Sequence, residues 1–169
     1  MKQISKLFAF VIIGLAFTVS SFAQVSATAT ATATIVSPIA ITKTTDMNFG
    51  NVAVSSAAGT VVLAPDGTRT RTGGVTLPAT VGTVTAAAFN VTGTAGYTYS
   101  IAITGAPLTV TSGANTMTVT AFTSTPATPG TLAAGNNALT VGATLNVAGS
   151  QAAGVYVSGT PFTVTVNYN

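Results

Sequence analysis

The closing stretch of the chain, residues 162–168, alternates strictly between apolar and polar side chains, and this alternation constrains the fold more than any other feature. A period of two indicates a half-buried β-strand with one face toward a core. A strand of this kind can also offer a free edge, which proteins either cover or use for pairing. We therefore predict both core packing and an acceptor edge for its four apolar residues, Phe162, Val164, Val166 and Tyr168.

A second alternating stretch, residues 27–36 (ATATATATIV), has small side chains, no charge and no turn residue. It is a disordered leader, an ordinary first strand, or a strand that is donated to a neighbouring copy. β-Branched Thr favours strands, whereas Ala is depleted in them. If the segment is donated, we expect its alanine face to point into the partner, and main-chain hydrogen bonds to supply much of the hold because methyl groups bury little area. The donor-strand candidates are Ala27, Ala29, Ala31, Ala33 and Ile35.

Residues 1–23 have the pattern of a secretory signal peptide. Lys2 and Lys6 precede an apolar run over residues 7–19, and Ser21 and Ala23 occupy the small-residue positions of a cleavage site. The alternative, a membrane anchor, is weaker because the apolar run is short for a span. We therefore expect export through the periplasm to the cell surface or the medium, with no membrane span in the mature chain. The predicted divisions are a signal peptide (1–23), an N-terminal extension (24–36) and a β-sandwich domain (37–169).

The composition argues against an enzyme. The chain has no His, Cys or Trp, and its two acidic residues are Asp46 and Asp66. Proton transfer near neutral pH relies on His or a tuned carboxylate, zinc on His or Cys, and a nucleophilic hydroxyl on a neighbouring base. We expect both aspartates in turns, since a calcium site needs more clustered carboxylates, and Arg69 and Arg71 on a solvated hairpin. We therefore predict no catalysis, cofactor or metal, and too few cations for nucleic acid.

Short alternating or apolar runs, separated by Gly, Pro and Asn turns, recur throughout residues 37–169. The clearest are a hairpin over 108–120 and a long strand over 139–147, and we also expect one strand over 47–54 with Gly50 at a bulge or close approach. No helical period follows the N-terminal run. The pattern predicts an all-β sandwich of short antiparallel strands. A solenoid is the alternative, but no repeat of fixed period is present.

Three stretches in this order resemble one family. Residues 47–52 (MNFGNV) are similar to an early element of chaperone–usher pilins, residues 88–101 to their central pair of strands, and residues 154–169 to their last strand. The overall pattern is similar to spore coat protein U and archaic pilin subunits, and within that branch to the secreted family catalogued as domain of unknown function 4402. The residues that carry the resemblance are Phe49, Gly50, Gly154 and Tyr168.

This resemblance implies an immunoglobulin-like sandwich that lacks its final strand. A periplasmic chaperone, and later the N-terminal extension of the next subunit, would complete the sandwich by strand addition. The implied partners are copies of the chain or related subunits, the chaperone, and an outer-membrane usher. Two features depart from the family pattern: the chain has no Cys for the disulfide that such pilins often carry, and no acidic residue lies near the last strand.

The function predicted from these observations is that of a secreted structural subunit of a surface pilus or fibre, assembled by strand exchange and serving cell adhesion. One alternative is a monomeric β-sandwich that binds carbohydrate or a surface through its loops. A remote alternative is an ice-binding protein, suggested by Thr-x-Thr spacing in several strands. That activity needs a flat array in register, which the sequence does not display as a repeat.

Overall fold

The computed structural model describes residues 24–169, and every regular element in this range is a β-strand. The predicted signal peptide lies outside the described residues. Residues 24–34 are exposed and have no regular secondary structure, and the folded unit spans Ile35–Asn169. The described part of the chain contains no helix with the length and apolar character that a membrane crossing requires.

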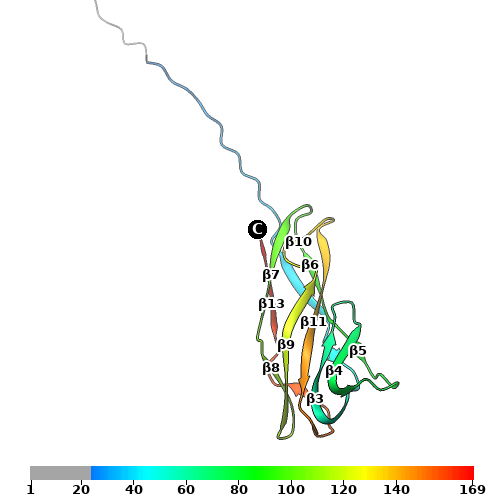
Figure 1. Cartoon of the computed structure of the whole chain (residues 1–169). Coiled ribbons are helices and arrows are strands. Elements are labelled where there is room, and N and C mark those ends of the chain that lie inside the picture. Colours follow the sequence, from blue (N-terminus) through cyan, green and yellow to red (C-terminus); the bar gives the residue numbers. More distant parts are fainter. Residues whose placement is uncertain (1–23) are drawn as a thin grey trace, which may run out of the picture. The chain divides into compact units, whose positions relative to one another are not determined.

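The strands of the folded unit are short and antiparallel, as the turn spacing predicts, and the all-β sandwich-like fold is confirmed (Figure 1). In chain order they are β1 (Ala40–Thr45), β2 (Asn48–Phe49), β3 (Ala53–Leu63), β4 (Arg69–Thr76), β5 (Val84–Thr85), β6 (Ala87–Thr92), β7 (Thr98–Thr104), β8 (Leu108–Ser112), β9 (Asn115–Thr125), β10 (Gly130–Thr131), β11 (Asn136–Val147), β12 (Val157–Ser158) and β13 (Thr163–Tyr168). The predicted hairpin over 108–120 is confirmed as β8 and β9, and the predicted strand over 139–147 as β11.

The larger sheet is built around β11. Its order is β1-β6-β11-β9-β8-β12, with β3 and β4 continuing beside the second half of β11. Figure 1 shows the second half of β11 running between β9 and β3. The inward side chains of β11 alternate with polar ones, so one face of the sheet is apolar and the other is rich in threonine.

On one of its sides, β11 changes partner at Gly142. Val141 pairs with Ala87 of β6, whereas Ala143 pairs with Leu63 of β3. The end of β3 passes so close that a Cβ on Gly142 would overlap the carbonyl oxygen of Leu63. A residue without a Cβ therefore lets two strands share one edge of β11.

The smaller sheet has the order β10-β7-β13 and covers only part of the apolar face. Thr163 of β13 pairs with Thr104 of β7, and Tyr168 pairs with Tyr99. Between this sheet and the larger one lies the β7–β13 cluster. Its buried members are Val91, Tyr99, Leu132, Leu139 and Val166. The inward face predicted for the last strand is confirmed, because Val166 is buried while Thr165 is exposed.

A second group of apolar residues, the β8–β9 cluster, lies where the smaller sheet has ended. After Thr104 the chain crosses to the larger sheet and continues as β8, and β13 begins only opposite that same residue. The buried members of the cluster are Val61, Val75, Leu108, Val119, Ala143, Leu145 and Val147. No strand of the smaller sheet covers this cluster within residues 24–169, and only β2, β12 and irregular segments flank it.

The prediction of one continuous strand over residues 47–54 is wrong, because β2 ends at Phe49 and β3 begins at Ala53. Gly50 between them has φ +69°, a left-handed conformation that interrupts a strand. A Cβ at Gly50 would lie 2.6 Å from Cγ2 of Val84, so the close approach predicted for this glycine is confirmed. The turn at Gly50 makes residues 46–54 a wall beside the β8–β9 cluster.

Candidate functional site

A groove of about 1060 Å³ with an apolar floor opens over the β8–β9 cluster. The larger sheet supplies its floor, which consists of the side chains of Leu108, Val110, Met117, Val119, Leu145 and Val147. Removing the apolar floor side chains from water is favourable, so the groove suits an apolar occupant.

One side of the groove is formed by residues 46–54, here called the β2 wall. Its β-pairing is short, with Asn48 opposite Thr85 and Phe49 opposite Val84. Additional hydrogen bonds hold the loop after Gly50: the Asn51 amide donates to the Val81 carbonyl at 2.8 Å, and the Asn51 side chain donates to the Thr80 carbonyl at 3.0 Å.

A long side chain from β4 also reaches the β2 wall. Nη1 of Arg69 donates to the Phe49 carbonyl and, at 3.1 Å, to the Asn51 carbonyl. The expectation that both hairpin arginines are solvated is therefore wrong for Arg69, which is partly buried. Arg71 is exposed and donates to the Val75 carbonyl within its own hairpin at 2.9 Å.

The opposite side of the groove, the β12 wall, is formed by residues 151–158 together with Pro161 and Phe162. Tyr156 fixes its turn, because the phenol donates to the Ala152 carbonyl at 2.7 Å and accepts from Nε2 of Gln151 at 2.8 Å. Val155 and Val157 are 82% and 61% exposed, so the rim of the groove is apolar and in contact with water.

Of the four residues predicted at the acceptor edge, the structure brings one to the groove. Phe162 lines it, with its ring 4.8 Å from that of Phe122. Val164, Val166 and Tyr168 instead pack in the β7–β13 cluster, where both sheets are present. The C-terminal residue of the groove lining, Phe162, thus immediately precedes β13, and the groove floor comes from the predicted hairpin over 108–120 and the predicted strand over 139–147.

The four residues that carry the family resemblance divide in the same way. Phe49, Gly50 and Gly154 line the groove, the first two from the β2 wall and the third from the β12 wall. Tyr168 lies in the β7–β13 cluster, with its ring 5.5 Å from that of Tyr97. Three of these four residues therefore lie on the two walls of the groove.

Four of the five donor-strand candidates belong to the exposed segment that precedes the folded unit. Ala27, Ala29, Ala31 and Ala33 are exposed and lie outside any strand. Ile35, at the start of the folded unit, is 98% exposed. A large aliphatic side chain that is fully in water has area to bury in a partner.

The titratable side chains serve local structure. Lys43 and Asp46 form an exposed ion pair of 2.6 Å. The Thr68 hydroxyl and amide donate to Oδ1 of Asp66 at 2.7 and 2.9 Å, and these hydrogen bonds hold the pKa of that carboxyl below its usual value. Burial raises the pKa of the Tyr99 phenol above its usual value of 10.0. Within residues 24–169 no group of three acidic, His or Cys side chains converges on a metal position.

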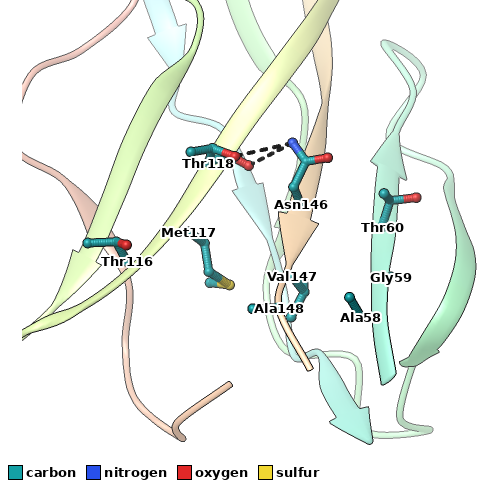
Figure 2. A pocket seen from close by; sticks show the side chains of 9 residues that line it. All are labelled: Ala58, Gly59, Thr60, Thr116, Met117, Thr118, Asn146, Val147 and Ala148. Carbon is teal, nitrogen blue, oxygen red and sulfur yellow. Dashed lines mark hydrogen bonds between the residues drawn. The ribbon is translucent and has the colours of Figure 1, made fainter. Parts of the chain in front are cut away.

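A shallower hollow of about 520 Å³ lies across β3, β9 and β11. Figure 2 shows the amide of Asn146 turned toward Thr118, and Nδ2 donates to the Thr118 carbonyl at 3.2 Å and to the Thr120 hydroxyl at 3.0 Å. Asn146 is in register with Thr118 on one side and with Thr60 on the other.

The fold and the groove define an antiparallel, sandwich-like β-domain in which one part of the core is covered by strands on both faces and the other part on one face only. A family model described as "Domain of unknown function (DUF4402)" matches residues 39–168, and the chain belongs to this family. The predicted resemblance to that family is confirmed. No curated protein and no solved structure matches the chain.

Proposed function

We propose that the protein is a structural subunit of a surface fibre, and that its groove accepts a β-strand from another subunit. The observation that carries the proposal is the missing cover over the β8–β9 cluster. The β2 wall follows β1 in the chain, and the β12 wall precedes β13, so the groove lies between segments that are adjacent in sequence to the first and last strands of the domain. In an immunoglobulin-like sandwich, one further strand would fit at this place.

Two terms favour the uptake of a strand. An extended segment in the groove can hydrogen-bond to backbone groups on the edge of β2 that does not pair with β5. Its alternate side chains can cover the six apolar floor residues, at roughly 25 cal/mol per Å² of apolar area removed from water. The groove also has no charged floor residue, which matches an uncharged strand.

The N-terminal extension of a second copy is the proposed donor. It is exposed, uncharged and alternating, and it precedes a folded unit that has its own first strand in β1. Small alanine side chains bury little area, so Ile35 supplies the largest apolar group of the donor. Related subunits with bulkier extensions would fit the same groove.

Export of the chain is part of the proposed function, because a surface fibre is assembled outside the cytoplasm. The signal-peptide pattern of residues 1–23 would direct the chain to the periplasm, where a chaperone would protect the groove before an outer-membrane usher passes the subunit to the surface. These partners follow from the resemblance to archaic pilins and spore coat protein U. Fibres of this kind commonly serve adhesion.

Deletion of residues 24–36 tests the proposal. We expect the complete chain to form fibres that are visible by electron microscopy, and the deletion variant to stay folded by circular dichroism without forming them. Fibres of the deletion variant that grow as readily as those of the complete chain would refute donor-strand exchange. A monomeric carbohydrate-binding module, the alternative, would elute as a monomer in both forms and form no fibres.

A further inference from the structure

We infer that Arg69 is a positioning residue for strand uptake, because it holds the β2 wall in place from behind and so keeps the groove formed before a strand arrives. Arg69 does not line the groove. It acts through Phe49 and Asn51, two lining residues whose carbonyls accept from its guanidinium. The inference rests on the strand-exchange function proposed above.

The wall pairs with β4 only at its end, through Ala53 and Val54, and the Arg69 guanidinium reaches the part of the wall before this pairing. Arg69 starts β4, which is paired with β3 in the larger sheet, whereas Phe49 and Asn51 lie on the irregular β2 wall. The planar guanidinium can donate to two carbonyls at once, and hydrogen bonds from a charged donor are stronger than neutral ones. One side chain therefore attaches the wall to the sheet on both sides of Gly50.

Gly50 fits this arrangement. A Cβ at this position would lie 2.9 Å from Nη1 of Arg69, so the guanidinium occupies space that a side chain would need. Its φ of +69° turns the flanking carbonyls of Phe49 and Asn51 toward one donor. The glycine and the arginine thus form one structural unit.

Arg69 is committed to these carbonyls because the carboxylates of the described residues are engaged elsewhere. Asp46 pairs with Lys43, and Asp66 accepts from Thr68 in the preceding turn. Ala53 and Val54 pair with β4, and the Asp46 carbonyl accepts from the Thr85 hydroxyl, whether or not the guanidinium is present. Between these points, the wall without the guanidinium would keep the hydrogen bonds of Asn51 and the two-residue pairing with β5. A ladder of this length is weak on its own, so the wall would become mobile.

The test compares Arg69→Met with Arg71→Met in the complete chain. Both changes remove a cation from the same strand, but Arg71 bonds only within its hairpin. Hydrogen exchange should accelerate about tenfold in residues 46–54 of Arg69→Met, which corresponds to about 1.4 kcal/mol, and should be unchanged in β6, β11 and β13. Fibre growth on wild-type seeds should slow by a similar factor. Arg69→Lys should recover part of both effects, and Arg71→Met should match the wild type.

Several outcomes would overturn the inference. Exchange that rises equally in every strand would assign Arg69 to general stability, and unchanged exchange in residues 46–54 would show that the wall does not depend on it. Wild-type growth rates in Arg69→Met would show that wall position does not limit uptake. If the wild-type chain forms no fibres, the proposed function fails, whereas hydrogen exchange still decides whether Arg69 holds the wall.

Discussion

The phenol of Tyr168 donates a hydrogen bond of 2.8 Å to the backbone carbonyl of Ser37, 131 positions earlier in the chain. The same oxygen accepts from the Thr94 amide at 2.7 Å. These bonds attach the end of β13 to the segment before β1 and to the loop after β6. They hold together the part of the sandwich that contains the β7–β13 cluster, away from the groove.

Replacing Tyr168 with Phe should therefore destabilise the domain. The partly buried Thr94 amide would lose its acceptor, and an unsatisfied buried donor costs about 1–3 kcal/mol. Urea denaturation should show a lower midpoint with an unchanged slope. Tyr97→Phe is the control, because it leaves both hydrogen bonds and the contact between the two rings in place. Equal losses in the two variants would contradict this role for the phenol.

Gly50→Ala should be more destabilising than Gly113→Ala. Both glycines have positive φ, +69° and +59°, so each change costs about 1–2 kcal/mol of backbone strain. At Gly50 the new methyl group would also overlap the Val81 carbonyl and crowd Val84, whereas nothing lies within 4 Å of the position at Gly113. The difference in unfolding free energy between the two variants measures the cost of the steric overlap at Gly50. Similar unfolding free energies would argue against this overlap.

The buried phenol of Tyr99 predicts a loss of stability in alkali. Tyr99 is 0% exposed, and burial raises its pKa, so the folded state holds this proton more tightly than the unfolded chain. Its contribution is complete below about pH 10, where an unfolded tyrosine titrates, and is lost as the pH rises through the higher pKa of the folded state. Unfolding free energies between about pH 8 and 11 should fall more steeply for the wild type than for Tyr99→Phe. Parallel curves would contradict the assignment.

Two exposed valines allow a matched test of the groove. Val157 lies on the rim of the groove and is 61% exposed, whereas Val62 lies on the outer face of the larger sheet and is 37% exposed. Val157→Asp should leave the subunit folded but reduce fibre growth by about tenfold or more, because an unpaired carboxylate would face an apolar strand. Val62→Asp should assemble normally. Sedimentation of assembled material measures both, and equal assembly would place the acceptor surface elsewhere.

Ala31→Arg and Thr32→Arg test the donor. Both residues are exposed in the segment that precedes the folded unit, so neither change should affect the circular dichroism of the subunit. Alternation places the two side chains on opposite faces of a donated strand. Ala31→Arg should abolish fibres, because the cation would lose hydration against the groove at a cost of several kcal/mol, and Thr32→Arg should assemble. Fibres of normal length from Ala31→Arg would contradict the proposed face.

Features that depend on local periodicity were predictable from the sequence. The alternation in residues 162–168 places Val166 inside and Thr165 outside because side chains on a strand alternate by geometry alone. The β8–β9 hairpin follows from two alternating runs around a Gly-containing turn. Gly50 was expected at a close approach, although a continuous strand through it was not compatible with its left-handed backbone.

The position of the groove was not predictable in this way. It depends on the chain leaving the smaller sheet at the end of β7, at Thr104, and entering the larger sheet as β8. Which strands pair in each sheet depends on residues far apart in the sequence. The floor residues Val110 and Met117 have the same alternation whether or not a second sheet covers them. Arg69 had no sequence signal either, because its partners are backbone carbonyls 20 and 18 positions earlier.

β11 alone among the described strands places buried side chains in both core clusters, with Leu139 in one and Leu145 in the other. The two halves of the domain are therefore coupled through the core side chains of this strand and through β9, which pairs with it on both sides of Gly142. Cooperative melting depends on contacts that cross between regions, so a subunit without a donated strand should melt in two steps, with the β8–β9 half opening first. A strand bound in the groove would contact both halves, so they would unfold together. Calorimetry should then show two transitions for the free subunit and a single transition for the fibre.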